Sequence, residues 1–132
     1  MLRRLDPPAI HRPASSYCQL TEDTNTGTIY VAGQVGLAPD GTLVGVDMAS
    51  QLRQVLANFD AILRELGLDR AAFARRSVFV TDMDEYFTDA VNGQMTAYFE
   101  PNRCPSTLIG VSRLFMPDVK IEVEAVLVRP RG

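Results

Sequence analysis

The sequence predicts a single α+β domain in which two helices cover one face of a mixed β-sheet. Two segments carry apolar residues at three- and four-residue spacing, which is typical of helices buried along one side. The other apolar runs are short and rich in β-branched residues, or alternate with polar residues, as strands do. The predicted order is strand, strand, helix, strand, helix, strand, strand. Two helices in such an order pack on one face of the sheet.

The length of the chain fits one domain. A chain of 132 residues buries about two thirds of its unfolded surface, which is enough for one hydrophobic core but not for two. We therefore expect one domain over residues 1–132, with residues 1–14 as an extended N-terminal arm that contains three prolines.

Two strands and the clearer helix are predicted in the first half of the chain. Short apolar runs place the strands at 17–20 and 28–35. The helix is expected over 48–66, because Asp47 is a suitable N-cap and Gly67 stands where a left-handed C-cap belongs. Its apolar stripe comprises Met48, Leu52, Val55, Leu56, Phe59, Ile62, Leu63 and Leu66.

The second half of the chain is predicted to hold the other helix and three strands. A strand is expected at 77–80, a helix over about 82–99 that Pro101 ends, and strands at 107–111 and 119–128. In the last strand Val119, Ile121, Val123, Ala125 and Leu127 share one face, and Lys120, Glu122 and Glu124 share the other. Because the helices cover only one face of the sheet, we expect the other face to meet a second copy of the chain.

Composition and charge exclude several classes of function. With 13 Lys and Arg against 16 Asp and Glu, the net charge is −3, which argues against binding to nucleic acid. No apolar run approaches the roughly 20 residues of a spanning helix, and residues 1–13 do not resemble a secretory signal. Cys18 and Cys104 lie far apart and are expected to be free thiols. We therefore expect a cytoplasmic protein without a membrane partner.

Few residues carry recognisable chemistry. His11 is the only histidine and is expected to be exposed in the arm, so a catalytic triad is not predicted, and no cysteine–histidine spacing predicts a metal site. Glu122 lies in mid-strand between apolar neighbours on the uncovered face. Burial there would raise its pKa and suit a general base that acts on water. The alternative is a surface glutamate paired with Lys120 or an arginine, and periodicity does not choose between Glu122 and Glu124.

Three segments resemble the reactive-intermediate deaminase (Rid, YjgF-like) family. They are Tyr30–Val35, Ser77–Met83 and Asp118–Ala125, and the pattern from Pro105-Ser106 to Glu124 resembles the closing signature of the family. The likeness extends from about residue 17 to residue 128. It implies a compact chorismate-mutase-like (YjgF-like) fold and a homotrimer with small-molecule clefts between subunits. It also implies hydrolysis of imines and enamines to ketoacids and ammonium without a cofactor.

The resemblance assigns roles to individual residues. It implies that Glu122 positions the attacking water, and that Gly33 beside Ala32, together with Tyr17 and Asn92, lines the cleft. Each of these has a simpler explanation. Gly33 would allow close packing, Tyr17 would bury its ring, and Asn92 would be an ordinary exposed helix residue.

The sequence departs from the family where an arginine pairs with the substrate carboxylate. That position is Ser106, and loss of such a pair costs about 10²- to 10⁴-fold in affinity. Arg103 and Arg113 are an odd number of residues away, so a regular strand would point them to the other face unless a loop intervenes. Leu108 would make the cleft more apolar. We therefore expect weak activity on simple 2-imino acids, and a metabolite-binding trimer without turnover stays open. Endoribonuclease activity is a third, less favoured reading.

Overall fold

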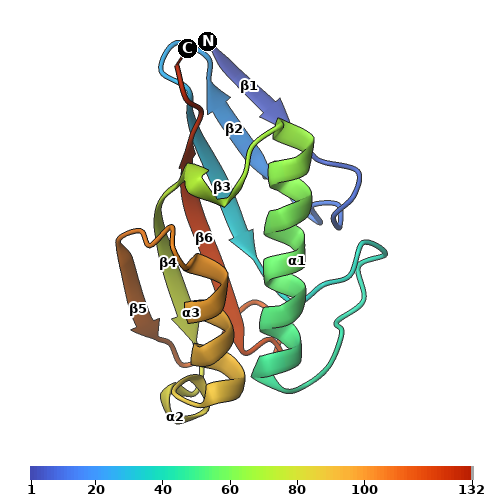
Figure 1. Cartoon of the computed structure of the whole chain (residues 1–132). Coiled ribbons are helices and arrows are strands. Elements are labelled where there is room, and N and C mark those ends of the chain that lie inside the picture. Colours follow the sequence, from blue (N-terminus) through green and yellow to red (C-terminus); the bar gives the residue numbers. More distant parts are fainter. Residues whose placement is uncertain (132) are drawn as a thin grey trace.

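The computed structural model describes residues 1–131 and consists of one six-stranded sheet with helices on one side (Figure 1). The strand order is β1-β2-β3-β6-β4-β5, with β4 and β5 parallel and all other neighbours antiparallel. The strands are β1 (Leu2–Leu5), β2 (Leu20–Asp23), β3 (Thr28–Gln34), β4 (Phe73–Val80), β5 (Ser106–Gly110) and β6 (Ile121–Val128). The predicted α+β class with a mixed sheet is confirmed.

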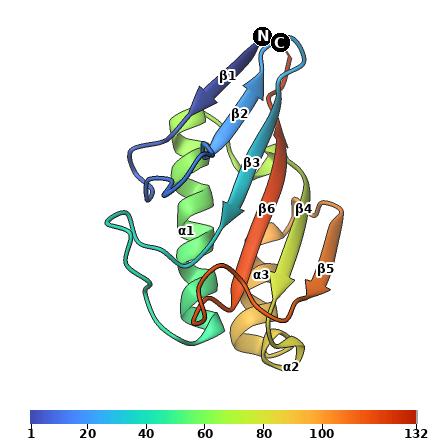
Figure 2. The same ribbon diagram turned by 180° about the vertical axis from the view of Figure 1, so that it is seen from behind.

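The helices form a layer on one face, and no helix covers the other face in the described part of the chain (Figure 2). They are α1 (Met48–Leu66), a 3₁₀ turn (Arg70–Ala72), α2 (Met83–Tyr86), a π-helical turn (Asp89–Gly93) and α3 (Gln94–Phe99). The main core lies between α1, α3 and the sheet. None of the helices within residues 1–131 is long and apolar enough to cross a bilayer.

Helix α1 begins and ends where its capping residues predict. The Asp47 carboxylate accepts a hydrogen bond from the Ser50 amide at 2.9 Å. Gly67 has φ 69°, and its amide donates to the Arg64 carbonyl. The predicted stripe is buried against the sheet.

The ends of the chain differ more from the sequence prediction. Residues 2–5, within the predicted arm, form β1 and pair with β2, and the first predicted strand lies three residues later, at 20–23. The predicted helix over 82–99 is divided, because Thr88 adopts an extended conformation (φ −110°, ψ 159°) between α2 and the π-helical turn. Its hydroxyl donates to the Glu85 carbonyl at 2.9 Å, which closes α2.

A β-bulge in β3 sets the geometry of the open face. Val31 pairs with Ala125 but Gln34 pairs with Val123, so Ala32 and Gly33 together stand opposite one residue of β6. The bulge breaks the alternation expected for this strand, and Gln34 becomes fully buried.

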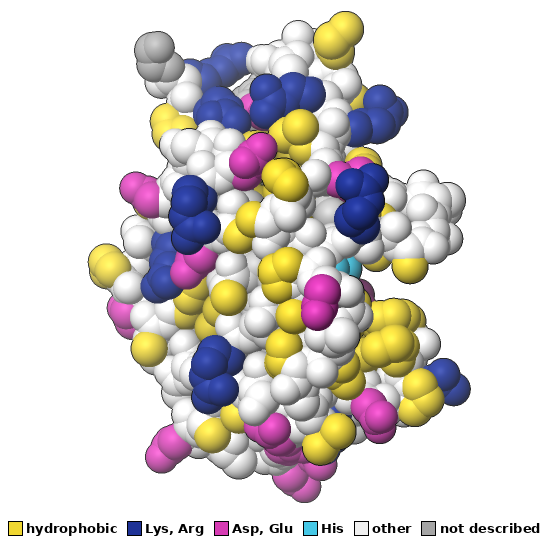
Figure 3. Space-filling view, turned by 90° about the vertical axis from the view of Figure 1, so that its right-hand side faces the viewer, with side chains coloured by type: hydrophobic (Ala, Val, Ile, Leu, Met, Phe, Trp, Pro, Cys, Tyr) yellow, Lys and Arg dark blue, Asp and Glu magenta, His cyan; other side chains and the backbone are white. Residues whose placement is uncertain are grey.

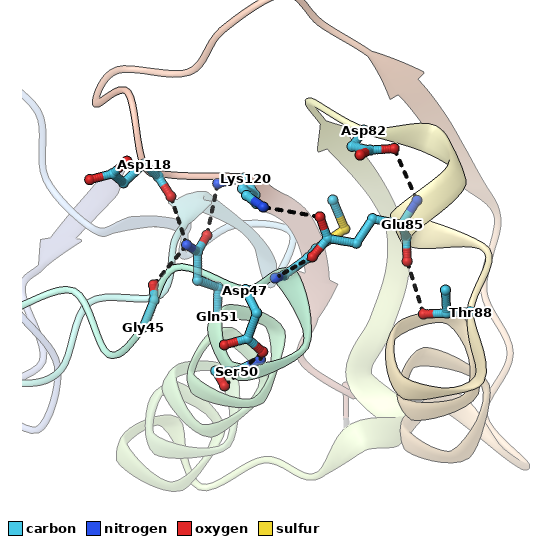
Figure 4. A network of polar contacts seen from close by, with 10 residues as sticks. Gly45, Asp47, Ser50, Gln51, Asp82, Glu85, Thr88, Asp118 and Lys120 are labelled. Carbon is cyan, nitrogen blue, oxygen red and sulfur yellow. Dashed lines mark hydrogen bonds and ion pairs between the residues drawn. The ribbon is translucent and has the colours of Figure 1, made fainter.

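A buried polar network fixes the start of β6 (Figure 4). The Gln51 side chain of α1 donates to the Asp118 carbonyl at 2.7 Å and accepts from the Lys120 amide at 2.8 Å. The Lys120 ammonium is paired with Glu85 at 3.1 Å. Glu122 is the second residue of β6, two positions after Lys120, so its position depends on the Gln51 side chain of the helix layer.

Candidate functional site

A pocket of about 330 Å³ lies on the open face of the sheet, where β3 and β6 meet the N-terminal loop. Four of the residues predicted for the site line it: Tyr17, Ala32, Gly33 and Glu122. Figure 3 shows the single histidine of the chain at a hollow beside hydrophobic side chains. One protomer therefore brings together four of the seven predicted site residues, including the candidate base.

Glu122 is half-buried in this pocket and has no cation within ion-pair distance among residues 1–131. The alternative pairing with Lys120 is wrong, because Lys120 pairs with Glu85. Burial raises the pKa of the Glu122 carboxyl above its usual value, and the negative charge of Glu124 raises it further. Glu124 itself is exposed and lines a separate hollow of about 160 Å³. The structure thus distinguishes Glu122 from Glu124 as the candidate base, which the periodicity of the strand could not do.

Gly33 leaves the space that the Glu122 side chain occupies. A Cβ atom at residue 33 would lie 2.7 Å from Cδ and 2.8 Å from Cγ of Glu122. The simpler explanation, close packing in a strand, therefore holds, but the group packed against the glycine is the candidate base. The bulge and the missing side chain together allow the carboxylate to lie against the backbone of β3.

His11 is buried, with 4% of its surface exposed, and not exposed as the sequence predicts. The Gln19 amide donates to the His11 carbonyl at 3.0 Å and lies 3.3 Å from His11 Nε2, while Gln34 donates to Gln19 at 2.8 Å. Burial lowers the pKa of His11, which favours the neutral ring. His11 thus forms a buried, uncharged part of the pocket wall.

Of the six lining residues that sequence reasoning missed, His11, Arg12 and Phe115 carry ring or charged groups. No local pattern marks them, because two loops that are distant in sequence bring them to the pocket. A metal site has no support either, since residues 1–131 contain no group of three His, Cys, Asp or Glu side chains placed to hold an ion.

The other predicted residues lie elsewhere in the protomer. Ser106 and Leu108 are on the edge strand β5, which β4 separates from β6. Asn92 lines a pocket of about 170 Å³ together with Arg76 and Arg103. A single copy therefore does not join these residues to Glu122.

The parity argument about the neighbouring arginines does not apply to Arg103. Strand β5 begins at Ser106, so Arg103 lies in the preceding loop, where its amide donates to the Pro101 carbonyl at 3.0 Å. Arg113 lies beyond the end of β5, which is at Gly110.

The raised pKa of Glu122 predicts a stability cost that depends on pH. Because the folded-state pKa lies above the unfolded one, the carboxylate destabilises the fold fully above the folded pKa and not at all below about pH 4. We expect Glu122→Gln to raise the free energy of unfolding at pH 8 and to change nothing at pH 3.5. Thermal unfolding across pH measures this. Glu124→Gln is the matched control and should give the smaller gain, whereas a lower melting temperature for Glu122→Gln at pH 8 would contradict the prediction.

Comparisons with known proteins identify a family match, a related sequence and two similar structures. The family model for Endoribonuclease L-PSP matches residues 9–129. The 2-iminobutanoate/2-iminopropanoate deaminase of Escherichia coli K12 is 36% identical over 104 residues, which cover 76% of this chain and 79% of that protein. YyfA from Yersinia pestis, a Rid family protein of unknown function, has a similar structure with a TM-score of 0.86, 26% identity, and coverage of 98% of this chain and 100% of that one. The structure of Escherichia coli TdcF with bound serine is also similar, with a TM-score of 0.84 and 25% identity. The match covers 97% of this chain and 99% of that one.

Proposed function

The chain belongs to the Endoribonuclease L-PSP family, which includes the Rid and RutC proteins, and from this we propose that it hydrolyses the C=N bond of small reactive imines or enamines. The observation that carries the proposal is the half-buried Glu122 carboxylate, which has no counter-ion within residues 1–131 and faces a pocket of about 330 Å³. A desolvated carboxylate with a raised pKa is suited to exchange protons with water near neutral pH.

In the proposed reaction, Glu122 accepts a proton from a water molecule. The water oxygen bonds to the imine carbon, the π electrons move to nitrogen, and nitrogen takes the proton from Glu122, which gives a carbinolamine and restores the carboxylate. Glu122 then relays the hydroxyl proton to nitrogen, so that the C–N bond breaks and a carbonyl compound and ammonia leave. No cofactor takes part in these steps. An enamine enters the sequence after tautomerising to the imine.

We also propose that the working form is a homotrimer with each cleft shared by two copies. The support is the division of the predicted residues. Glu122 and Gly33 line one pocket, whereas Ser106 lies two strands from β6 and Asn92 lines another pocket from the π-helical turn. The uncovered sheet face also exposes Tyr30, Ile109 and Val128 to solvent. A monomer in sedimentation experiments would overturn this assembly. The two free cysteines support a reducing, cytoplasmic setting.

The proposed substrate differs from the simplest 2-imino acids. The similar protein from Escherichia coli is named for 2-iminobutanoate and 2-iminopropanoate. Here Ser106 is exposed on the edge strand and offers a hydroxyl where the family has a guanidinium. We therefore propose that this chain acts slowly on those two compounds.

The test is to generate imines in situ and to follow their decay with and without the protein. Wild type should accelerate decay of an accepted imine, and Glu122→Gln should lose the acceleration. Because Glu122 must be ionised, the rate should rise with pH through a pKa above the usual value for glutamate. Equal ligand affinity for both proteins without turnover in either would instead establish a binding protein.

A further inference from the structure

Arg76 is a half-buried arginine without a counter-ion. Its Nη1 donates to the Cys104 sulfur at 3.2 Å, and its guanidinium carbon lies 3.9 Å from the centre of the Phe99 ring. Its Nε is buried without a hydrogen-bond partner, and no carboxylate of residues 1–131 lies within ion-pair distance. An arginine held in this way is costly unless an anion joins it.

The position of Arg76 connects it to the predicted site. It lies on β4 directly opposite Ser106 in the parallel register, and its amide donates to the Pro105 carbonyl at 3.0 Å. Side chains at paired positions of neighbouring strands point to the same face of a sheet. Arg76 also lines the 170 Å³ pocket that contains Asn92. Two of the three predicted residues that are absent from the Glu122 pocket, Asn92 and Ser106, therefore adjoin Arg76.

Two other arginines compete for the role of anion anchor. Arg12 lines the Glu122 pocket but is exposed, and Arg103 is exposed beside Asn92. Exposed side chains must give up hydration and rotamer freedom on binding. Arg76 is already ordered by Cys104 and an aromatic ring, and a stacked guanidinium presents a fixed fork to a carboxylate. The pocket also contains the exposed Glu100, whose charge opposes an anion without pairing with Arg76.

Resting on the proposed function, we infer that Arg76 binds a carboxylate of the substrate and so replaces the anchor that Ser106 lacks. The imine is then attacked at Glu122 of a second copy. Arg76 lies on the strand next to that of Ser106, one strand further from the sheet edge. Neighbouring strands are roughly 4.8 Å apart. A carboxylate held there lies several bonds from the reacting carbon. The substrate class is thus an imine or enamine with an acidic side chain rather than a simple 2-imino acid.

Binding of two stable ketoacids by calorimetry tests this inference. 2-Oxoglutarate carries a distal carboxylate, and 2-oxobutanoate does not. Wild type should bind 2-oxoglutarate at least 10-fold more tightly than 2-oxobutanoate. Arg76→Gln should remove that difference. Arg64→Gln, which removes the same charge from an exposed position on α1, should leave the difference unchanged.

Further arms make each outcome decisive. Arg76→Lys keeps the charge without the fork and should retain only part of the preference, which covers the case in which Arg76→Gln unfolds. Loss of the preference in Arg12→Gln, with Arg76→Gln unchanged, would overturn the inference. The proposed function is tested separately through Glu122→Gln. If wild type shows the Arg76-dependent preference but no turnover, the proposed hydrolysis is wrong and the role of Arg76 in binding stands. If turnover is lost in Glu122→Gln but unaffected in Arg76→Gln, the proposed hydrolysis stands and the role of Arg76 is wrong.

Discussion

Replacing Gly33 by alanine is expected to abolish most imine hydrolysis while the protein stays folded. The added Cβ would lie 2.7 Å from Cδ of Glu122, closer than atoms can approach. The obstructing group is the end of a flexible side chain, so the carboxylate will move away and the strand will not. A general base contributes about 10²- to 10⁴-fold to a rate, and its displacement should cost a similar factor. The kcat/KM for an accepted imine measures the loss.

Gly36→Ala is the matched control, because its Cβ would meet the backbone and the hydrogen-bonded side chain of the buried Gln51. That atom would lie 2.8 Å from Cα of Gln51 on α1. Gly36→Ala should therefore lower the melting temperature, whereas Gly33→Ala should lower activity at nearly unchanged stability. Partial rescue of Gly33→Ala by the shorter Glu122→Asp would confirm the cause. Full activity in Gly33→Ala would show that the Glu122 carboxylate does not act from the place that Gly33 leaves open.

Residue types and local periodicity were enough to predict the fold class, helix α1 and the face of Glu122. They were not enough for the interior of the site. The bulge at Ala32 and Gly33 depends on how β3 pairs with β6, and a strand pattern with period two cannot reveal it. The prediction that His11 is exposed was wrong for a similar reason. Its partner is Gln19, which in turn accepts a hydrogen bond from Gln34, and no pattern near His11 indicates these contacts.

The role of Arg76 was also hidden from sequence. Closeness to Ser106 in the chain suggested only Arg103 and Arg113, and strand parity argued against both of them. Arg76 lies 30 positions earlier and becomes adjacent only through the parallel pairing of β4 and β5. Such pairing is a property of the assembled sheet, so spacing within one strand gives no information about it.

Ser106→Arg is expected to raise kcat/KM for 2-iminobutanoate by about 10²- to 10⁴-fold. The added guanidinium would restore a bidentate partner for the carboxylate next to the reacting carbon. Ser106 is exposed at the sheet edge, so the larger side chain has room to extend away from Arg76, which lies opposite it on β4. Ser106→Gln, which is uncharged, should give no gain, and Ser106→Lys should give a smaller one because it lacks the fork.

The same gain in kcat/KM for 2-iminobutanoate should persist in the double variant Ser106→Arg/Arg76→Gln, because an arginine at position 106 would bind the carboxylate without Arg76. Preference for an imine with a distal carboxylate should disappear in that protein, since this preference depends on Arg76. The two arginine positions would then select substrates by the distance between carboxylate and reacting carbon. An unchanged rate on 2-iminobutanoate in a Ser106→Arg protein that still forms trimers would show that residue 106 does not face the bound substrate. The proposal that two copies share each cleft in this way would then be wrong.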